Sequence, residues 1–95
     1  MPEPDEPATA PAPCEHVVFT DLGGDEAVLV DLDTKSYFRL NGTASLVWRG
    51  LARQLPVDQI ALDMTARYDV SLEDARASVE AAVGEFLARR LVRQA

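Results

Sequence analysis

The chain lacks the features that stabilise secreted or membrane-embedded proteins. Its 95 residues include one cysteine, Cys14, so no disulfide can form within the chain. No apolar run is long enough to cross a bilayer, and no secretory signal is recognisable. These absences predict a soluble, cytoplasmic protein in reducing surroundings. Cys14 is expected to be an inert thiol, because no base is ordered beside it in the sequence.

Basic charge is also scarce. Nine Lys and Arg face sixteen Asp and Glu, and the formal net charge is −7. Four of the acids lie in the first fifteen residues, so the remainder still has nine basic against twelve acidic side chains. A mildly acidic domain is not expected to have a positively charged surface that would bind the phosphate backbone of a nucleic acid. Nucleic-acid binding is therefore the less favoured alternative for this chain.

Catalytic and metal-binding patterns are missing as well. His16 has no cysteine or carboxylate at metal-ligand spacing along the chain, and there is no cysteine pair, phosphate-binding glycine loop or nucleophile elbow. The acid pairs Asp31 with Asp33 and Glu73 with Asp74 border a turn and begin a helix, where capping explains them. The sequence predicts no enzyme activity, no cofactor and no metal site.

Proline is concentrated at the N-terminus, where five of the six prolines lie within the first fifteen residues together with four acids. Such a segment buries too little apolar surface to offset the entropy of ordering it. We expect a disordered acidic tail over residues 1–15 and one folded domain over residues 16–95.

From His16 onward the pattern predicts three strands and then three helices. Residues 16–20 and 27–32 flank a Gly-Gly-Asp loop and are expected to form a hairpin, with residues 36–40 as the third strand of an antiparallel meander. Apolar side chains at helical spacing then predict one helix from Asn41 to Pro56, a second ending near Asp69, and a third of roughly twenty residues. The expected fold is α+β and winged-helix-like.

The third strand, residues 36–40, is predicted to carry the function. Alternation places Phe38 and Leu40 toward the core and Tyr37 and Arg39 outward. Within the strand there is no proline, lysine or bulge of the kind that usually guards an edge. An unguarded aromatic edge beside a long apolar helix favours binding of an extended peptide by β-strand addition. Two alternatives remain open: the tail covers this edge, or a second copy of the chain does.

The amino-acid sequence of this region is similar to that of a known family. Residues Tyr37-Phe38-Arg39-Leu40-Asn41, followed by Thr43-Ala44 and Leu46-Val47-Trp48, resemble the PqqD-like family, named for the coenzyme PQQ synthesis protein D. The similarity continues through residues 66–70, 73–75 and 86–92 and covers all but the tail. Short phrases at residues 29–34 and 46–51 look most like the stand-alone leader-binding proteins of lasso-peptide biosynthesis.

The resemblance implies a RiPP recognition element, a non-catalytic adaptor or peptide chaperone that binds the leader of a ribosomally made precursor peptide. In this family the leader adds a strand beside the third strand and packs against the third helix. The partners would be a precursor leader peptide, a separate leader protease and a cyclase. A chaperone for a peptide modified by a radical-SAM enzyme is the alternative.

Together these arguments predict the site. Residues 36–40 supply backbone pairing, apolar side chains line a groove, and basic side chains meet acidic leader residues at its rim. The predicted peptide-binding residues are Lys35, Ser36, Tyr37, Phe38, Arg39, Leu40, Arg76, Val79, Ala82, Val83 and Phe86.

Two positions depart from the family pattern. Ser78 stands where many relatives have an acid, which would alter leader contacts. Arg90 replaces a common helix-ending glycine, so we expect the last helix to run on past it.

Overall fold

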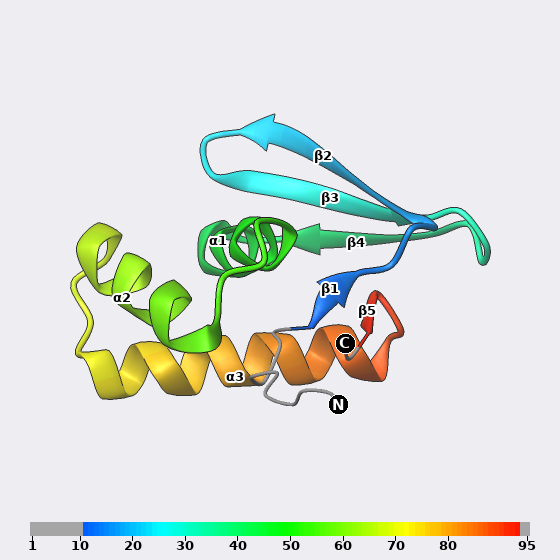
Figure 1. Cartoon of the computed structure of the whole chain (residues 1–95). Coiled ribbons are helices and arrows are strands. Elements are labelled where there is room, and N and C mark those ends of the chain that lie inside the picture. The colour runs from blue at the N-terminus through cyan, green and yellow to red at the C-terminus, as the bar shows by residue number, and fades with distance from the viewer. Residues whose placement is uncertain (1–10, 94–95) are drawn as a thin grey trace, which may run out of the picture.

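The computed structural model describes residues 11–93 (Figure 1). Strands β2, β3 and β4 form an antiparallel sheet in that order, and three helices follow. The α+β class and the order of strands and helices are as predicted. The elements are β1 (Ala12–Pro13), β2 (Val17–Gly23), β3 (Glu26–Asp31), β4 (Ser36–Leu40), α1 (Gly42–Ala52), α2 (Val57–Arg67), α3 (Leu72–Ala88) and β5 (Val92–Arg93).

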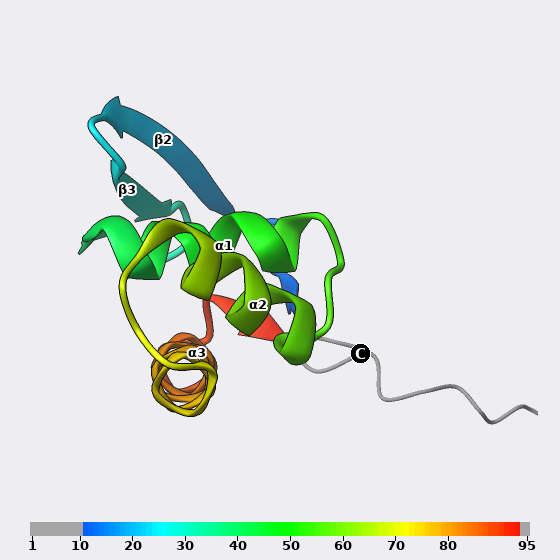
Figure 2. The same ribbon diagram turned by 90° about the vertical axis from the view of Figure 1, so that its left-hand side faces the viewer.

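Helix α1 occupies the middle of the fold. It lies between the sheet and α3, as two views at right angles show (Figures 1 and 2). Its buried face presents Val47, Trp48 and Leu51, and the Trp48 ring meets Phe86 of α3 edge-on with centroids 5.2 Å apart. The buried residues of the sheet, α2 and α3 belong to the same core. Packing in this core fixes the position of β4 relative to α3.

Two helices begin at side-chain caps that the sequence predicts. Asn41 Oδ1 accepts a hydrogen bond from the Ala44 N–H at 2.9 Å, and Ser71 Oγ accepts one from the Asp74 N–H at 3.1 Å. Each cap satisfies a backbone donor that the first turn of a helix leaves without a partner. The N-cap at Asn41 starts α1 immediately after β4, which ties the edge strand to the core helix.

The end of α1 falls earlier than expected. The first helix stops at Ala52 rather than continuing to Pro56, whereas the second ends at Arg67 with Tyr68 as its C-cap, near Asp69 as predicted. Gln54 takes a left-handed φ of 63°, which turns the chain before Pro56 is reached. The proline instead occupies the N-cap of α2, where its missing N–H costs nothing.

The last helix contradicts the expectation for Arg90. Helix α3 ends at Ala88, and Arg90 adopts a φ of 59° in the left-handed region that favours glycine. The Leu91 N–H donates to the Phe86 carbonyl at 2.8 Å and the Arg90 N–H to the Leu87 carbonyl at 3.0 Å. These are the two hydrogen bonds of a Schellman motif. The turn forms without glycine. Burial of Leu91 in the core offsets the steric cost of the left-handed conformation at Arg90.

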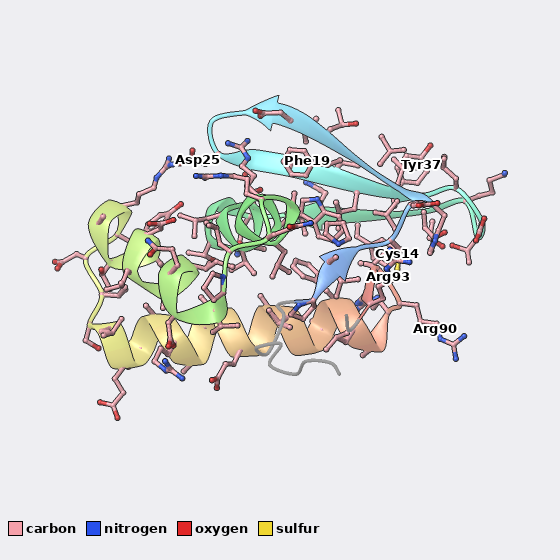
Figure 3. All side chains as sticks on the ribbon, in the orientation of Figure 1. Cys14, Phe19, Asp25, Tyr37, Arg90 and Arg93 are labelled. Atoms are coloured by element: carbon pink, nitrogen blue, oxygen red, sulfur yellow. The ribbon has the colours of Figure 1, made fainter. Side chains whose placement is uncertain are left out.

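The N-terminal boundary also differs from the predicted one. β1 pairs with β5, with Ala12 opposite Arg93, and the Cys14 N–H donates to the Leu91 carbonyl at 3.0 Å. Figure 3 shows Cys14 and Arg93 side by side at this pairing. Residues 12–14 thus join the fold that we expected to begin at His16. The rest of the predicted tail, residues 1–10, lies outside the described residues.

No helix within residues 11–93 is both long and apolar enough to span a membrane.

Candidate functional site

The free edge of β4 is the first component of the candidate site. Among the described residues β4 pairs only with β3, in an uninterrupted register from Asp31 opposite Ser36 to Ala27 opposite Leu40. Residues along a strand direct their backbone groups alternately to the two sides. The residues of β3 that do not bond to β2 bond to β4. They therefore show which backbone N–H and C=O groups of β4 stay free at its outer edge.

Two hydrogen bonds settle that alternation. The Leu32 N–H donates to the His16 carbonyl at 2.8 Å, toward β2, whereas the Asp31 carbonyl accepts from the Lys35 N–H at 2.7 Å, toward β4. It follows that the residues of β4 opposite Asp31, Leu29 and Ala27 bond to β3. The N–H and C=O groups of Tyr37 and Arg39 are left at the outer edge, where an added strand would meet them.

A hollow beside this edge is the second component. It has a volume of about 380 Å³ and lies between β4 and the C-terminal half of α3. Its lining residues are Tyr37, Phe38, Arg39, Leu40, Ala44, Ala82, Glu85, Phe86, Arg89 and Leu91. Edge and hollow together offer main-chain pairing and a pocket for side chains.

The two faces of β4 have different surroundings, as alternation predicts. Phe38 and Leu40 face the core, and Leu40 is 6% exposed. Tyr37 is 75% exposed on the opposite face of the sheet. It lies opposite Val30 of β3, which in turn lies opposite Val18 of β2, so the three side chains form a cross-strand row. An exposed aromatic ring at the end of an apolar row is the kind of anchor that binding surfaces use.

The charged groups of the hollow are already paired within the chain. Arg39 donates to Glu26 Oε1 at 2.9 Å, and Arg89 donates to Glu85 Oε2 at 2.7 Å. The Arg89 guanidinium also lies 5.2 Å from the centre of the Phe38 ring. All four charged side chains are at least half exposed, so these ion pairs contribute little stability and can exchange partners.

The structure places the sequence-predicted residues in several different surroundings. Residues 37–40, Ala82 and Phe86 line the hollow, and Ser36 opens the edge strand. Val79 and Val83 are buried in the core at 0% and 8% exposure. Lys35 lies in the preceding turn, where its ammonium donates to the Leu32 carbonyl at 3.1 Å.

Arg76 lies apart from the hollow. Its guanidinium pairs with Asp58 of α2 and with Glu80 one turn along α3. Four further residues line the hollow that the sequence did not predict, namely Ala44, Glu85, Arg89 and Leu91. No local signal marks Glu85 and Arg89, because an i,i+4 polar pair on a long helix looks like any other solvated pair along the sequence.

A cluster of His16, Asp31 and Asp33 lies at the turn that leads into β4. Asp31 Oδ1 accepts hydrogen bonds from the backbone N–H of Asp33 at 2.9 Å and of Thr34 at 3.2 Å. Burial raises the pKa of Asp31, but the backbone donors of Thr34 and Asp33 and the charge of His16 outweigh it and hold that pKa below its usual value. The turn is therefore stabilised by an ionised carboxylate.

The same cluster corrects one premise of the sequence analysis. His16, isolated along the chain, lies within 3.7 Å of Asp31 and 3.9 Å of Asp33. Their potential ligand atoms all lie within 4.8 Å of one another. Since Asp31 Oδ1 already accepts hydrogen bonds from two backbone N–H groups, we infer that the role of the cluster is to stabilise the turn.

Comparison with known proteins agrees with this architecture. Residues 26–92 match the model of the family described as Coenzyme PQQ synthesis protein D (PqqD). The chain belongs to the PqqD family. The matched segment runs from the first residue of β3 to the first residue of β5 and contains both β4 and α3. No curated protein matched the sequence.

Two solved structures share the fold of this PqqD-family chain. One is described as TbiB1 in complex with the TbiA(beta) leader peptide. Its TM-score is 0.78 at 23% identity, and the match covers 85% of this chain and 93% of that one. The other is described as lasso peptide synthetase B1 complexed with the leader peptide. Its TM-score is 0.73 at 20% identity, and the match covers 93% and 99% of the two chains.

Proposed function

We propose that the chain is a non-catalytic adaptor that binds the leader segment of a ribosomally made precursor peptide by β-strand addition at β4. The observation that carries the proposal is the outer edge of β4, which no other strand within residues 11–93 pairs with, beside the hollow that β4 forms with α3. The adaptor would deliver the bound peptide to a separate leader protease and a cyclase, as in lasso-peptide biosynthesis.

Main-chain pairing would provide the register. The free N–H and C=O groups of Tyr37 and Arg39 are two residues apart, which matches the repeat of an extended peptide. Pairing through backbone groups tolerates many leader sequences, so specificity has to come from side chains.

The hollow would supply that specificity. Alternate leader side chains would turn toward α3 and meet Phe38, Ala82 and Phe86. A volume of about 380 Å³ lies within the range of ordinary ligand pockets, about 300–1,000 Å³, and has room for apolar side chains. Burial of leader side chains there would add hydrophobic stabilisation to the backbone hydrogen bonds.

Charge at the rim would orient the leader. Arg39 and Arg89 each hold a carboxylate of this chain, and acidic leader residues are able to replace those partners. Lys35, at the start of the strand, would add a further positive charge.

The two similar structures support this assignment, because both are described as complexes with a leader peptide. The alternative, in which the chain is a PqqD-type chaperone for a peptide that a radical-SAM enzyme modifies, is less favoured, because one of the similar structures is described as lasso peptide synthetase B1. The two hypotheses use the same edge and differ only in the enzyme that receives the peptide.

The direct test is an NMR titration of the ¹⁵N-labelled chain with the leader of a precursor encoded beside it. We expect the amide resonances of residues 35–40 and of α3 near Phe86 to shift and saturate. Amides of α2 serve as the internal control. Saturable binding that leaves the resonances of residues 35–40 unmoved would refute strand addition at β4.

A further inference from the structure

One arginine connects the two walls of the hollow beside β4. Arg89 is the C-cap residue of α3, and its guanidinium lies over the Phe38 ring of β4, 5.2 Å from the centre of that ring. Both residues line the hollow. A strand added to the free edge of β4 would lie between these walls. A leader side chain that packs against Phe38 therefore has to pass or displace the Arg89 guanidinium.

A carboxylate of the same helix holds this guanidinium. The Arg89 Nε donates to Glu85 Oε2 at 2.7 Å, and Glu85 lies four residues earlier on α3. The side chains of Arg89 and Glu85 are 50% and 59% exposed, so water screens their attraction. Exposed pairs at this helical spacing contribute little stability. A second carboxylate brought to Arg89 can therefore replace that of Glu85.

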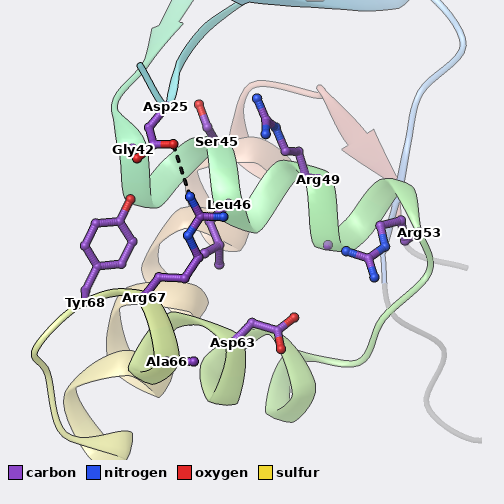
Figure 4. Close-up of a pocket in the computed structure, with 11 residues that line it drawn as sticks. Asp25, Gly42, Ser45, Leu46, Arg49, Arg53, Asp63, Ala66, Arg67 and Tyr68 are labelled. Carbon is purple, nitrogen blue, oxygen red and sulfur yellow. Dashed lines mark hydrogen bonds and ion pairs between the residues drawn. The ribbon is translucent and has the colours of Figure 1, made fainter. Parts of the chain in front are cut away.

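Other arginines of the chain pair between separate elements. Beside the second hollow, which lies between α1 and α2, Arg67 of α2 donates to Asp25 of the turn between β2 and β3 at 3.2 Å; a dashed line marks this pair in Figure 4. Arg49 of α1 donates to Asp21 of β2 at 2.8 Å and lies 5.3 Å from the centre of the Phe19 ring on the same strand. Replacing either carboxylate would break a contact between two elements.

The pair of Glu85 and Arg89 differs because both side chains come from the end of α3. Exchange of its carboxylate breaks no contact between elements. The contact of Arg89 with β4 is made through the face of the Phe38 ring, which attracts a cation without occupying all of its N–H donors. Arg89 is therefore placed to accept a new carboxylate beside an aromatic surface.

The geometry of an added strand determines where that carboxylate has to lie in the peptide. Side chains alternate between the two faces of a strand, so those turned toward α3 are two residues apart. An apolar side chain in the hollow and a carboxylate on Arg89 then belong to positions i and i±2. A residue at i±1 would turn to the opposite face of the sheet, the face on which Tyr37 lies.

Resting on the proposed function, we propose that Arg89 selects leaders that carry an acidic residue two positions from the apolar residue buried in the hollow. Glu85 sets this selectivity by competing for Arg89. A leader of this class takes the guanidinium, and the Glu85 carboxylate, already more than half exposed, returns to water at little cost. A leader without the acid leaves Arg89 over Phe38, where it limits access to the ring.

The test uses calorimetric titrations with two synthetic peptides. One is the leader of the precursor encoded beside the chain, and the other is an amide copy in which every Asp and Glu of that leader becomes Asn or Gln. The parent chain should bind the amide copy about fivefold more weakly. Arg89→Gln should bind both peptides equally, because the group that recognises the carboxylate is gone.

Arg90→Gln is the matched control for the loss of charge. It removes the same charge one residue later, from a side chain that does not line the hollow, and should keep the preference of the parent chain. A preference for the acidic leader that is as large in Arg89→Gln as in Arg90→Gln would overturn the proposal. Absence of any preference in the parent chain would overturn it as well.

Restoring single acids to the amide copy tests the spacing. A restored acid that recovers the affinity for the parent chain should lose this effect when it is moved by one residue, since it then turns to the other face. Arg89→Gln should respond to neither peptide. Equal recovery at adjacent positions would show a general attraction of charge and would overturn the predicted spacing.

Glu85→Gln tests the competition for Arg89. Without the internal carboxylate, the acidic leader should bind about threefold more tightly. Glu80→Gln is the control, because Glu80 pairs with Arg76 elsewhere on the same helix. A gain in Glu85→Gln no larger than in the control would overturn the role of Glu85.

The two proposals fail in different ways. If the parent chain binds neither peptide, strand addition at β4 and the selectivity of Arg89 are both refuted. If it binds both peptides with the same affinity, strand addition stands and the selectivity of Arg89 alone is refuted.

Discussion

The sheet has two edges, and they are built differently. β2 carries a register shift between Asp21 and Gly23, whereas β4 keeps an unbroken register with β3. A bulge twists a strand and interrupts its row of backbone groups, which is a common way to protect an edge from unwanted pairing. The edge that lacks this protection is the one beside α3.

The surroundings of the two edges differ as well. None of the residues of β2 is fully buried, and its last four are exposed. β4 ends in the buried Leu40 and forms one wall of a hollow whose other wall is α3. A peptide beside β2 would gain backbone hydrogen bonds alone, but a peptide beside β4 would also bury side chains. An edge is suited to peptide binding when a second element next to it can bury the side chains of the added strand.

The largest effect is expected when the backbone donor at the β4 edge is removed. Arg39→Pro eliminates a free N–H without breaking a bond to β3, and leader affinity should fall more than tenfold, about 1.4 kcal/mol or more. Calorimetric titration of leader peptide into the variant measures this. Arg39→Ala is the matched control, because it keeps the N–H and loses only the side chain. A folded proline variant that binds as tightly as the alanine variant would contradict strand addition.

The next effect concerns the exposed ring on the same strand. Tyr37→Ala should weaken leader binding by about 1–3 kcal/mol through lost packing. Its effect on stability should be small, because the side chain is 75% exposed. Val18→Ala is the control at the other edge, since Val18 ends the same cross-strand row on β2. If both alanine variants lose the same affinity, the distinction between the two edges is wrong.

A smaller effect is expected at the end of α3, which forms the wall of the β4 hollow. Arg90→Gly should stabilise the chain by about 1 kcal/mol, because glycine adopts the left-handed φ of 59° without steric cost. Urea unfolding measures the change. Leader affinity should stay the same, since Arg90 does not line the hollow. Destabilisation by glycine would mean that the Arg90 side chain makes a favourable contact.

The smallest effect depends on pH and lies in the turn between β3 and β4. The folded pKa of Asp31 is lowered, so its contribution to stability is complete above the usual pKa of 3.8 and is lost as pH falls through the lowered value. Asp31→Asn should therefore be less stable than the parent at neutral pH, and the difference should disappear in strong acid. Urea unfolding across this range is the measurement. A difference that does not change with pH would exclude the ionised carboxylate as its cause.

Much of the site was accessible from the sequence because strand alternation is a local property. The positions of Phe38 and Leu40 inside and of Tyr37 and Arg39 outside follow from a period of two residues. The absence of proline and bulge from residues 36–40 is also readable along the chain. Arg89 and Glu85 were missed because a polar pair on a long helix has no local mark that separates it from any other solvated pair.

The sequence by itself determined the order of elements, the caps at Asn41 and Ser71 and the apolar faces of the helices, since each depends on residues within a few positions of one another. Only the tertiary structure decided that α3 stops at Ala88 before the left-handed Arg90, that β1 and β5 pair, and which residues of α3 face the edge of β4. The burial of Leu91 outweighs the backbone preference at Arg90, and no local pattern records that balance.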